Sequence, residues 1–277
     1  MSSDAAIRCR GLGKAYQLYA RRTDQVKQLL FGNFHRFYLE YWVLRDIDLE
    51  VRRGESVGII GRNGAGKTTL LRLLCGISQP TCGELKVVGR VAPILALGAA
   101  FDWEMTGRQN VLIGSAVLGL RRSEILRRLP SIAEFAAIGP FIDQPVRLYS
   151  AGMRSRLAFA ICVHAEADIL IVDEALAVGD AAFRGKCLAF MESFRRRGTL
   201  IVVTHDMGQI KALCDRVIWV DDGGIRASGG VAEVLRLYDD ATEAEEDDGI
   251  RFRLADAAGA ASSQGAANRR HTKLSNE

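Results

Sequence analysis

The sequence lacks paired cysteines. Its 277 residues include six cysteines, which are scattered along the chain without a C-x-x-C pair among them. A disulfide framework is therefore not expected from this spacing. We expect isolated reduced thiols, as in a cytosolic protein.

The chain also lacks a long apolar run. Its longest uncharged apolar stretch, VAPILALGAAF at residues 91–101, has 11 residues, whereas a membrane-spanning helix needs about 20. The N-terminal stretch MSSDAAIRCRGLGKAY contains no apolar signal core. The sequence predicts neither a membrane span nor a signal peptide.

Charge of one sign does not dominate either. The net charge is +4 and basic residues are scattered among acidic ones, so nucleic acid is not expected as a partner. A mildly basic protein is compatible with work beside an anionic membrane surface. The hydrophobic content of 48% predicts a full core over most of the chain.

What is present is an alternation of short apolar runs with helical patterns. Two strands are predicted within 44–60, around a charged turn at 52–54, and a helix at 67–76. Residues 84–95 are β-rich, and further strands are predicted at 168–173, 199–204 and 216–221. From about 103 to 165 the pattern is mostly helical, with turns predicted at Gly119, Pro130, Gly139-Pro140 and Pro145. The fold class is therefore α/β, with a mostly parallel sheet, an antiparallel β segment and an inserted helical subdomain.

Two further segments have a different composition. Residues 16–43 carry apolar and aromatic side chains at helical spacing, and basic residues lie among them. This insertion predicts a helix that meets a membrane interface or a partner, or one that packs on the protein's own domain. The apolar and aromatic positions are Val26, Leu29, Leu30, Phe34, Phe37, Tyr38, Tyr41 and Trp42, interrupted by Gly32. The acidic and small polar residues of 241–277 predict a mostly disordered tail.

The stretch GRNGAGKTT at 61–69 matches the phosphate-loop pattern G-x-x-x-x-G-K-[ST]. It follows an apolar strand and opens a helix, so backbone amides are expected to point at β- and γ-phosphate oxygens. Lys67 supplies positive charge and Thr68 a hydroxyl for Mg²⁺. The predicted nucleotide-binding residues of the loop are Gly61, Arg62, Asn63, Gly64, Ala65, Gly66, Lys67, Thr68 and Thr69.

A second apolar strand, ILIVDE at 169–174, ends in two carboxylates. Asp173 is predicted to bind the magnesium shell. Glu174 is predicted to polarise a water molecule aimed at the γ-phosphate. Capping of the next helix is the structural alternative for this pair.

The stretch LYSAGMRSRLAF at 148–159 places a serine–glycine turn at the start of a predicted helix. Such a helix N-terminus makes a second anion-binding site. If it cannot reach its own phosphate loop, it can serve the loop of a second subunit. Two subunits arranged head to tail would then enclose two nucleotides.

The order of these motifs resembles that of the ABC-transporter ATPases over roughly residues 7–240. The phosphate loop is followed by YSAGM, where the family has its LSGGQ-type signature, then by LIVDE, AVGD and VTHD. The resemblance implies a P-loop NTPase core at 7–240 with its helical subdomain at about 103–165. Residues 241–277 are expected outside this domain.

The resemblance also implies roles for residues that spacing alone does not assign. Ser150 and Gly152 contact the γ-phosphate held by the opposite subunit, and Asp180 couples the two sites. His205 matches the switch histidine at the γ-phosphate. Tyr16, in GKAYQLY, resembles the aromatic residue that stacks on adenine. Tyr19, Tyr41 and a core role for Tyr16 are the alternatives.

Several stretches resemble the branch of the family that exports lipid-linked polysaccharides such as O-antigen or teichoic acid, which also tends to carry an insertion like 16–43. They are GIIGRNGAGKTTLL, TGRQN…LGL, YSAGMRSRLAFA and DEALAVGDAAFRGKC. Ala151 and Met153 depart from the LSGGQ pattern. Ala96 stands where the family has a glutamine or glutamate, and a methyl group cannot hold magnesium or water. Either Asp102 or Glu104 substitutes for it, or hydrolysis is slower, or coupling to the partner is altered.

The resemblance implies an ATP hydrolase that uses ATP and Mg²⁺ and forms a head-to-tail homodimer. It is expected at the cytoplasmic face of the inner (plasma) membrane, where it energises lipopolysaccharide-type export through a separate permease. One alternative is the same role for another substrate, such as teichoic acid or capsule. Another is a soluble ABC ATPase acting on DNA or the ribosome, although the sequence has neither a long coiled coil nor a second cassette. A catalytically weak regulatory cassette is the third.

Overall fold

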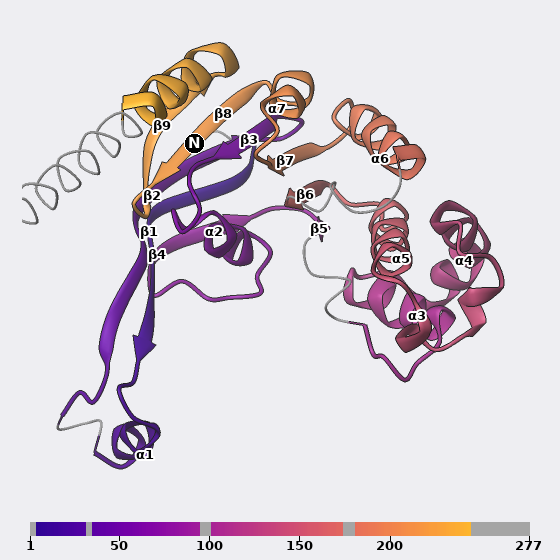
Figure 1. The fold of residues 1–277 in the computed structure, drawn as a ribbon, viewed down its shortest axis with the longest axis horizontal. Coiled ribbons are helices and arrows are strands. Elements are labelled where there is room, and N and C mark those ends of the chain that lie inside the picture. Colours follow the sequence, from indigo (N-terminus) through magenta and orange to yellow (C-terminus); the bar gives the residue numbers. More distant parts are fainter. Residues whose placement is uncertain (1–3, 32–34, 95–100, 174–180, 245–277) are drawn as a thin grey trace, which may run out of the picture. The chain divides into compact units, whose positions relative to one another are not determined.

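Two sheets form the frame of the molecule. The computed structural model describes residues 4–31, 35–94, 101–173 and 181–244. Its contacts divide the chain into two units, 1–231 and 232–277. Both sheets lie in the first unit, and Figure 1 shows their strands with the helices that follow them.

The smaller sheet is antiparallel and has the strand order β2-β1-β4. Its strands are β1 (Ala5–Leu18), β2 (Leu39–Arg52) and β4 (Cys82–Val87). Alternate residues of β1 and β2 are buried, for example Ile7 and Cys9 on one strand and Ile47 and Leu49 on the other. This period of two is typical of a sheet with one face in the core. The predicted antiparallel β segment is confirmed.

The larger sheet has six strands in the order β5-β6-β7-β3-β8-β9. Neighbouring strands are parallel except β8 and β9, which form an antiparallel pair. The residues of β3 and β7 are buried throughout, as expected for parallel strands covered on both faces. The strands are β3 (Ser56–Ile60), β5 (Val91–Pro93), β6 (Ile169–Asp173), β7 (Thr199–Val203), β8 (Arg216–Asp221) and β9 (Gly224–Gly230).

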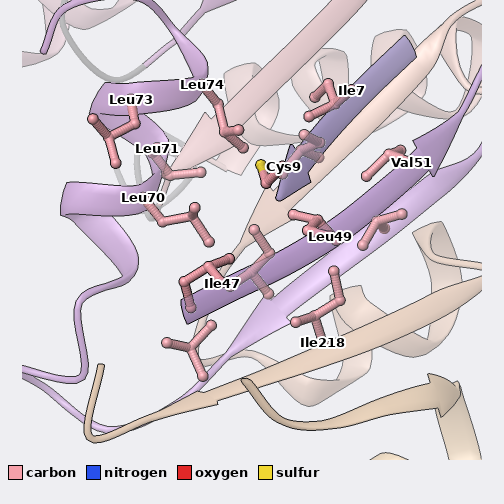
Figure 2. Close-up of a cluster of buried hydrophobic side chains, with 14 of the residues drawn as sticks. Ile7, Cys9, Ile47, Leu49, Val51, Leu70, Leu71, Leu73, Leu74 and Ile218 are labelled. Atoms are coloured by element: carbon pink, nitrogen blue, oxygen red, sulfur yellow. The ribbon is translucent and has the colours of Figure 1, made fainter. Parts of the chain in front are cut away.

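The main core lies between the two sheets and helix α2 (Lys67–Leu74). Figure 2 shows side chains of β1, β2 and α2 pointing toward one another, with Ile218 of β8 at one edge of the same cluster. Burying these side chains drives the association of the elements. As a result, α2 is packed directly behind the phosphate loop that precedes it. Its buried leucines are Leu70, Leu71, Leu73 and Leu74.

A helical block is inserted between β5 and β6, as predicted. It consists of α3 (Gly107–Val117), α4 (Arg122–Ala136), two short 3₁₀ helices and α5 (Ala151–Val163). The 3₁₀ helices are η1 (Gly139–Asp143) and η2 (Val146–Leu148).

The turn predicted at Pro130 is wrong, because Pro130 lies inside α4. A proline in a helix interior costs about 3 kcal/mol relative to alanine. Here Ile125, Leu129 and Ile132 are buried on one side of the same helix. Burial of each such side chain contributes about 1.5–3 kcal/mol, so the apolar stripe outweighs the proline.

The insertion 16–43 is helical only in part. Helix α1 (Arg22–Phe31) lies between β1 and β2, whose last pair in register is Leu18 with Leu39. Figure 1 shows α1 beyond the ends of these two long strands. Tyr41 and Trp42 belong to β2, so the predicted helical role of these two residues is wrong. Gly32 and Phe34 lie outside the described residues.

No residue of α1 is buried. Leu29 is 86% exposed and Leu30 67%, so the apolar side of α1 does not pack on the part of the protein that the structure describes. Beside the helix, the rings of Tyr19 and Tyr38 lie 5.8 Å apart. The insertion is predicted either to meet a membrane interface or a partner, or to pack on the protein's own domain. Helix α1 does not show the second arrangement.

The remaining helices are α6 (Ala181–Phe194), α7 (Met207–Leu213) and a helix over 231–244. The last helix runs past the boundary predicted at residue 240, and disorder beyond 244 stays a prediction because 245–277 lie outside the described residues. None of the described helices has the length and apolar character that crossing a membrane requires. All six cysteines are free thiols.

Candidate functional site

A cavity of about 420 Å³ opens beside the N-terminus of α2. It brings together the phosphate loop, the end of β6, the start of β2 and the turn between β8 and β9. The lining residues are Tyr41, Trp42, Val43, Asn63, Gly64, Gly66, Lys67, Thr68, Thr69, Asp173, Asp222 and Gly223.

The phosphate loop takes its shape from the turn that joins β3 to α2. Gly66 is the N-cap residue of α2 and has φ 103°, a left-handed conformation that side chains disfavour. A Cβ atom at this position would lie 2.7 Å from Leu44 Cδ2 and 3.0 Å from the carbonyl oxygen of Val43. The loop therefore passes close to β2 at a point where only glycine fits.

The first backbone amides of α2 face the cavity without a side-chain cap, because Gly66 supplies none. A helix N-terminus has unsatisfied N–H groups and the positive end of the helix dipole. Both features favour an anion at this point. The local backbone is thus suited to phosphate.

Lys67 adds a full positive charge to this end of the cavity. The residue is 7% exposed, and its Nζ donates to the carbonyl oxygens of Gly61 at 2.6 Å and Arg62 at 2.9 Å. These contacts hold the ammonium group inside the loop. Gly61, Arg62 and Ala65 belong to the loop but form its backbone support, whereas the other predicted loop residues line the cavity.

Thr68 and Asp173 line the same cavity. Asp173 ends β6, and Thr68 follows β3 through the loop, so both lie at the carboxyl ends of parallel strands of one sheet. A hydroxyl and a carboxylate are hard oxygen donors, the kind of ligand that Mg²⁺ takes beside nucleotide phosphates. The residues present therefore fit a magnesium ion.

Three predicted residues have no described position. Glu174, Asp180 and Ala96 all lie outside the described residues, within 95–100 and 174–180.

The two residues predicted as possible substitutes for Ala96, Asp102 and Glu104, do not line the cavity. Asp102 accepts a hydrogen bond from the backbone N–H of Glu104 at 3.0 Å, and Glu104 pairs with Arg147 at 3.3 Å. Both carboxylates are engaged within the inserted helical block.

His205 lies between β7 and α7 and is exposed. It follows the strand that separates β6 from β3, so it stands at the same edge of the sheet as the cavity. Its loop is fixed on both sides of the histidine. The Asp206 N–H donates to Thr204 Oγ1 at 3.0 Å, and the Asp206 carboxylate accepts from the N–H of Gly208 at 2.8 Å.

Ser150 is the N-cap of α5, and its Oγ accepts from the N–H of Met153 at 3.2 Å. Neither Ser150 nor Gly152 lines the cavity of its own chain. The preceding Tyr149 is anchored, because its hydroxyl donates to the carbonyl oxygen of Phe141 and burial raises the pKa of its phenol. The serine–glycine turn is thus a separate, firmly held helix N-terminus.

The aromatic side of the cavity differs from the main prediction. Tyr16 lies on β1 with Lys14 Nζ 5.2 Å from its ring centre, and it is not among the lining residues. Its cross-strand partner Tyr41 is, together with Trp42. The alternative Tyr41 therefore fits the cavity better than Tyr16. Trp42 was not predicted as a residue of this site, although its position just before the first predicted core strand could have indicated it.

Four of the six cysteines are poor candidates for a reactive group. Burial raises the pKa of four thiols to about 12, so they stay protonated at neutral pH and are poor nucleophiles. They are Cys9, Cys75, Cys187 and Cys214. Within the described residues no group of three or more histidine, cysteine or acidic side chains is arranged to hold a metal.

Comparison with known proteins points to one family. The model of the ABC transporter family matches residues 44–177. The O-antigen export system ATP-binding protein RfbB of Klebsiella pneumoniae is 43% identical over 230 residues, which are 81% of this chain and 94% of that protein. The teichoic acids export ATP-binding protein TagH of Listeria innocua is 41% identical over 241 residues, 87% of this chain and 71% of that protein.

A solved structure described as the ATP-binding subunit of an ABC transporter has the same fold. Its TM-score is 0.67 at 21% identity, and the match covers 84% of this chain and 93% of that one. The predicted fold class is confirmed by this likeness.

Proposed function

Since the chain belongs to the ABC transporter family, we propose that it is the ATP-binding and ATP-hydrolysing subunit of a transporter that exports a lipid-linked polysaccharide through a separate membrane permease. One observation carries the nucleotide part of this proposal. Lys67, the uncapped N-terminus of α2, Thr68 and Asp173 face a single cavity. Positive charge, amide donors and magnesium-type oxygens are the set that a nucleoside triphosphate needs.

In this function Lys67 and the loop amides bind the β- and γ-phosphate oxygens of ATP. Thr68 and Asp173 hold Mg²⁺, which neutralises charge on the phosphates when bound. Tyr41 or Trp42 provides the aromatic face for the base at the other side of the cavity. Glu174 accepts the proton of the attacking water, and His205 contacts the γ-phosphate.

The position of the serine–glycine turn supports a dimer. Ser150 caps a helix that does not line the cavity of its own chain, so its anion site is available to a second copy. In a head-to-tail pair, Ser150 and Gly152 of each subunit meet the γ-phosphate bound by the other. Asp180 couples the two sites. Binding of ATP closes the pair and hydrolysis opens it.

The names of the relatives support a proposal for the substrate and for the location of the protein. Proteins named for O-antigen export and for teichoic acid export are both above 40% identical to this chain. We favour a lipopolysaccharide-type glycan, with teichoic acid or capsule as the alternative substrate of the same ATPase. The protein works peripherally, at the cytoplasmic face of the membrane that holds its permease.

We expect α1 to be the surface that meets this membrane partner. Changing Leu29 to glutamate places a charge on its apolar side and removes a Leu side chain whose burial contributes about 1.5–3 kcal/mol. Association with membranes from cells that carry the transporter should fall at least about tenfold. Co-sedimentation measures the association, and ATP affinity should not change.

The matched control for α1 is Thr23→Glu, which adds the same charge to an exposed position of the same helix. Its association should equal that of the wild-type chain. Equal association of the Leu29→Glu protein would remove α1 as the contact surface.

Steady-state phosphate release by the purified chain tests the proposed function directly, and a chain that neither binds nor hydrolyses ATP would refute it.

Substitutions at Ala96 provide a second test with the same measurement. We expect Ala96→Glu to raise turnover by about tenfold, because it adds a carboxylate able to orient water. Ala96→Leu, which adds bulk without a polar atom, should not. Unchanged turnover in Ala96→Glu would show that Ala96 does not limit the rate.

A further inference from the structure

The turn between β8 and β9 contributes an acidic residue, Asp222, to the lining of the cavity. Asp222 and Gly223 form its two central residues, with φ 43° and 75°. Two positive φ angles in a two-residue hairpin favour the pair Asp-Gly. The turn type thus explains the positive φ angle of Asp222, but it does not require a carboxylate at this position.

This turn is hydrogen-bonded both to the phosphate loop and to β2. The N–H of Gly223 donates to the carbonyl oxygen of Ala65 in the phosphate loop at 3.3 Å. The carbonyl oxygen of Gly223 accepts from the N–H of Arg45 on β2 at 2.9 Å. A Cβ atom on Gly223 would lie 2.6 Å from the carbonyl oxygen of Val43. The turn therefore stands between the phosphate loop and the strand that carries Tyr41 and Trp42.

Asp222 is exposed and lines the cavity, and within the part of the chain that the structure describes its carboxylate has no hydrogen bond or ion pair. Its neighbour Asp221, in contrast, pairs with Arg226 at 2.7 Å. An ionised carboxylate only accepts hydrogen bonds, and it repels phosphate. Its complement in a nucleotide is a neutral donor group.

The position of the turn selects that donor group. In a nucleotide, the pentose joins the phosphates to the base. When the phosphates lie in the loop and the base lies against Tyr41 or Trp42, the pentose lies beside Asp222. The ribose hydroxyls are donors of the required kind. A carboxylate at this point favours a ribonucleotide over one that lacks these hydroxyls.

We propose that Asp222 is a specificity residue that accepts a hydrogen bond from a ribose hydroxyl of the bound nucleotide. The inference deepens the proposed function and rests on it, because it requires a nucleotide in this cavity. It assigns a ligand contact to the β8–β9 turn, outside the phosphate loop and the carboxylates at the end of β6.

The test compares ATP with 2′,3′-dideoxy-ATP, titrated with Mg²⁺ into the full chain by calorimetry. We expect the wild-type chain to bind ATP about tenfold more tightly, which is the fold-change for a charge-assisted hydrogen bond of about 1.4 kcal/mol. In Asp222→Gly, which keeps the turn because glycine accepts positive φ, the ratio of the two affinities should fall to about one. Titration of 2′-deoxy-ATP and 3′-deoxy-ATP then identifies the hydroxyl.

Asp46→Gly is the matched control. Asp46 is also an exposed aspartate with positive φ, at 50°, and it does not line the cavity. Its variant loses the same charge and should keep the tenfold ratio of the wild-type chain. Equal affinity of the wild-type chain for the two nucleotides would overturn the inference. The inference would also be overturned if the ratio of the two affinities stayed near ten in Asp222→Gly, or if this ratio fell equally in both variants. Absence of any ATP binding by the wild-type chain would instead refute the proposed function.

Discussion

The Glu174→Gln protein is expected to bind ATP as tightly as the wild-type chain and to hydrolyse it at least about a hundredfold more slowly. Glutamine has nearly the same shape as glutamate but cannot take a proton from water. Glu174 directly follows Asp173, which ends β6 at the cavity. Phosphate release at saturating ATP measures turnover, and titration calorimetry measures binding.

With hydrolysis blocked, the same variant should accumulate as an ATP-bound dimer in size-exclusion chromatography. Glu84→Gln is a suitable control, because Glu84 is exposed on β4 and away from this cavity. Its turnover and its monomer fraction should match those of the wild-type chain. Turnover that persists in Glu174→Gln would exclude Glu174 as the group that accepts the proton of water.

The second large effect is expected for Lys67→Ala, whose affinity for ATP should fall about a hundredfold, or about 2.7 kcal/mol. The Lys67 ammonium group is buried in the loop beside the N-terminus of α2. Charge-assisted hydrogen bonds to phosphate are roughly twice as strong as neutral ones, and alanine makes none of them. Calorimetric titration with ATP provides the measurement.

Lys86→Ala controls for the loss of one positive charge, because Lys86 is exposed on β4. Its affinity for ATP should equal that of the wild-type chain. A thermal unfolding curve for Lys67→Ala separates lost binding from lost folding, since Lys67 also donates to Gly61 and Arg62. A folded Lys67→Ala protein with unchanged ATP affinity would contradict the phosphate-loop assignment.

The phosphate end of the site could be predicted from the chain because its parts are contiguous. The loop residues 61–69 shape their own backbone, and the strand and helix on either side position that backbone. Asp173 was predictable for a related reason, since it ends a buried apolar strand and parallel strands end at one edge of a sheet. Each of these inferences needs only local structure and one rule of sheet architecture.

The aromatic end of the site could not be predicted in the same way. The spacing of aromatic residues in 16–43 fits a helix, yet Tyr41 and Trp42 pair in register with Tyr16 and Ala15 of β1. Pairing between distant strands overrides helical spacing because aromatic residues gain cross-strand contacts in a sheet. The same pairing decides that Tyr41, rather than Tyr16, lines the cavity.

The sequence alone determined the α/β class, the inserted helical block, the phosphate loop and the strand that ends in Asp173, all through local periodicity and contiguous motifs. Only the tertiary structure decided that Pro130 lies inside a helix, that α1 leaves its apolar side exposed, and that Asp222 lines the cavity. These outcomes depend on which distant segments pack together. Burial and strand register across the chain set that packing, and neither is encoded in the spacing of neighbouring residues.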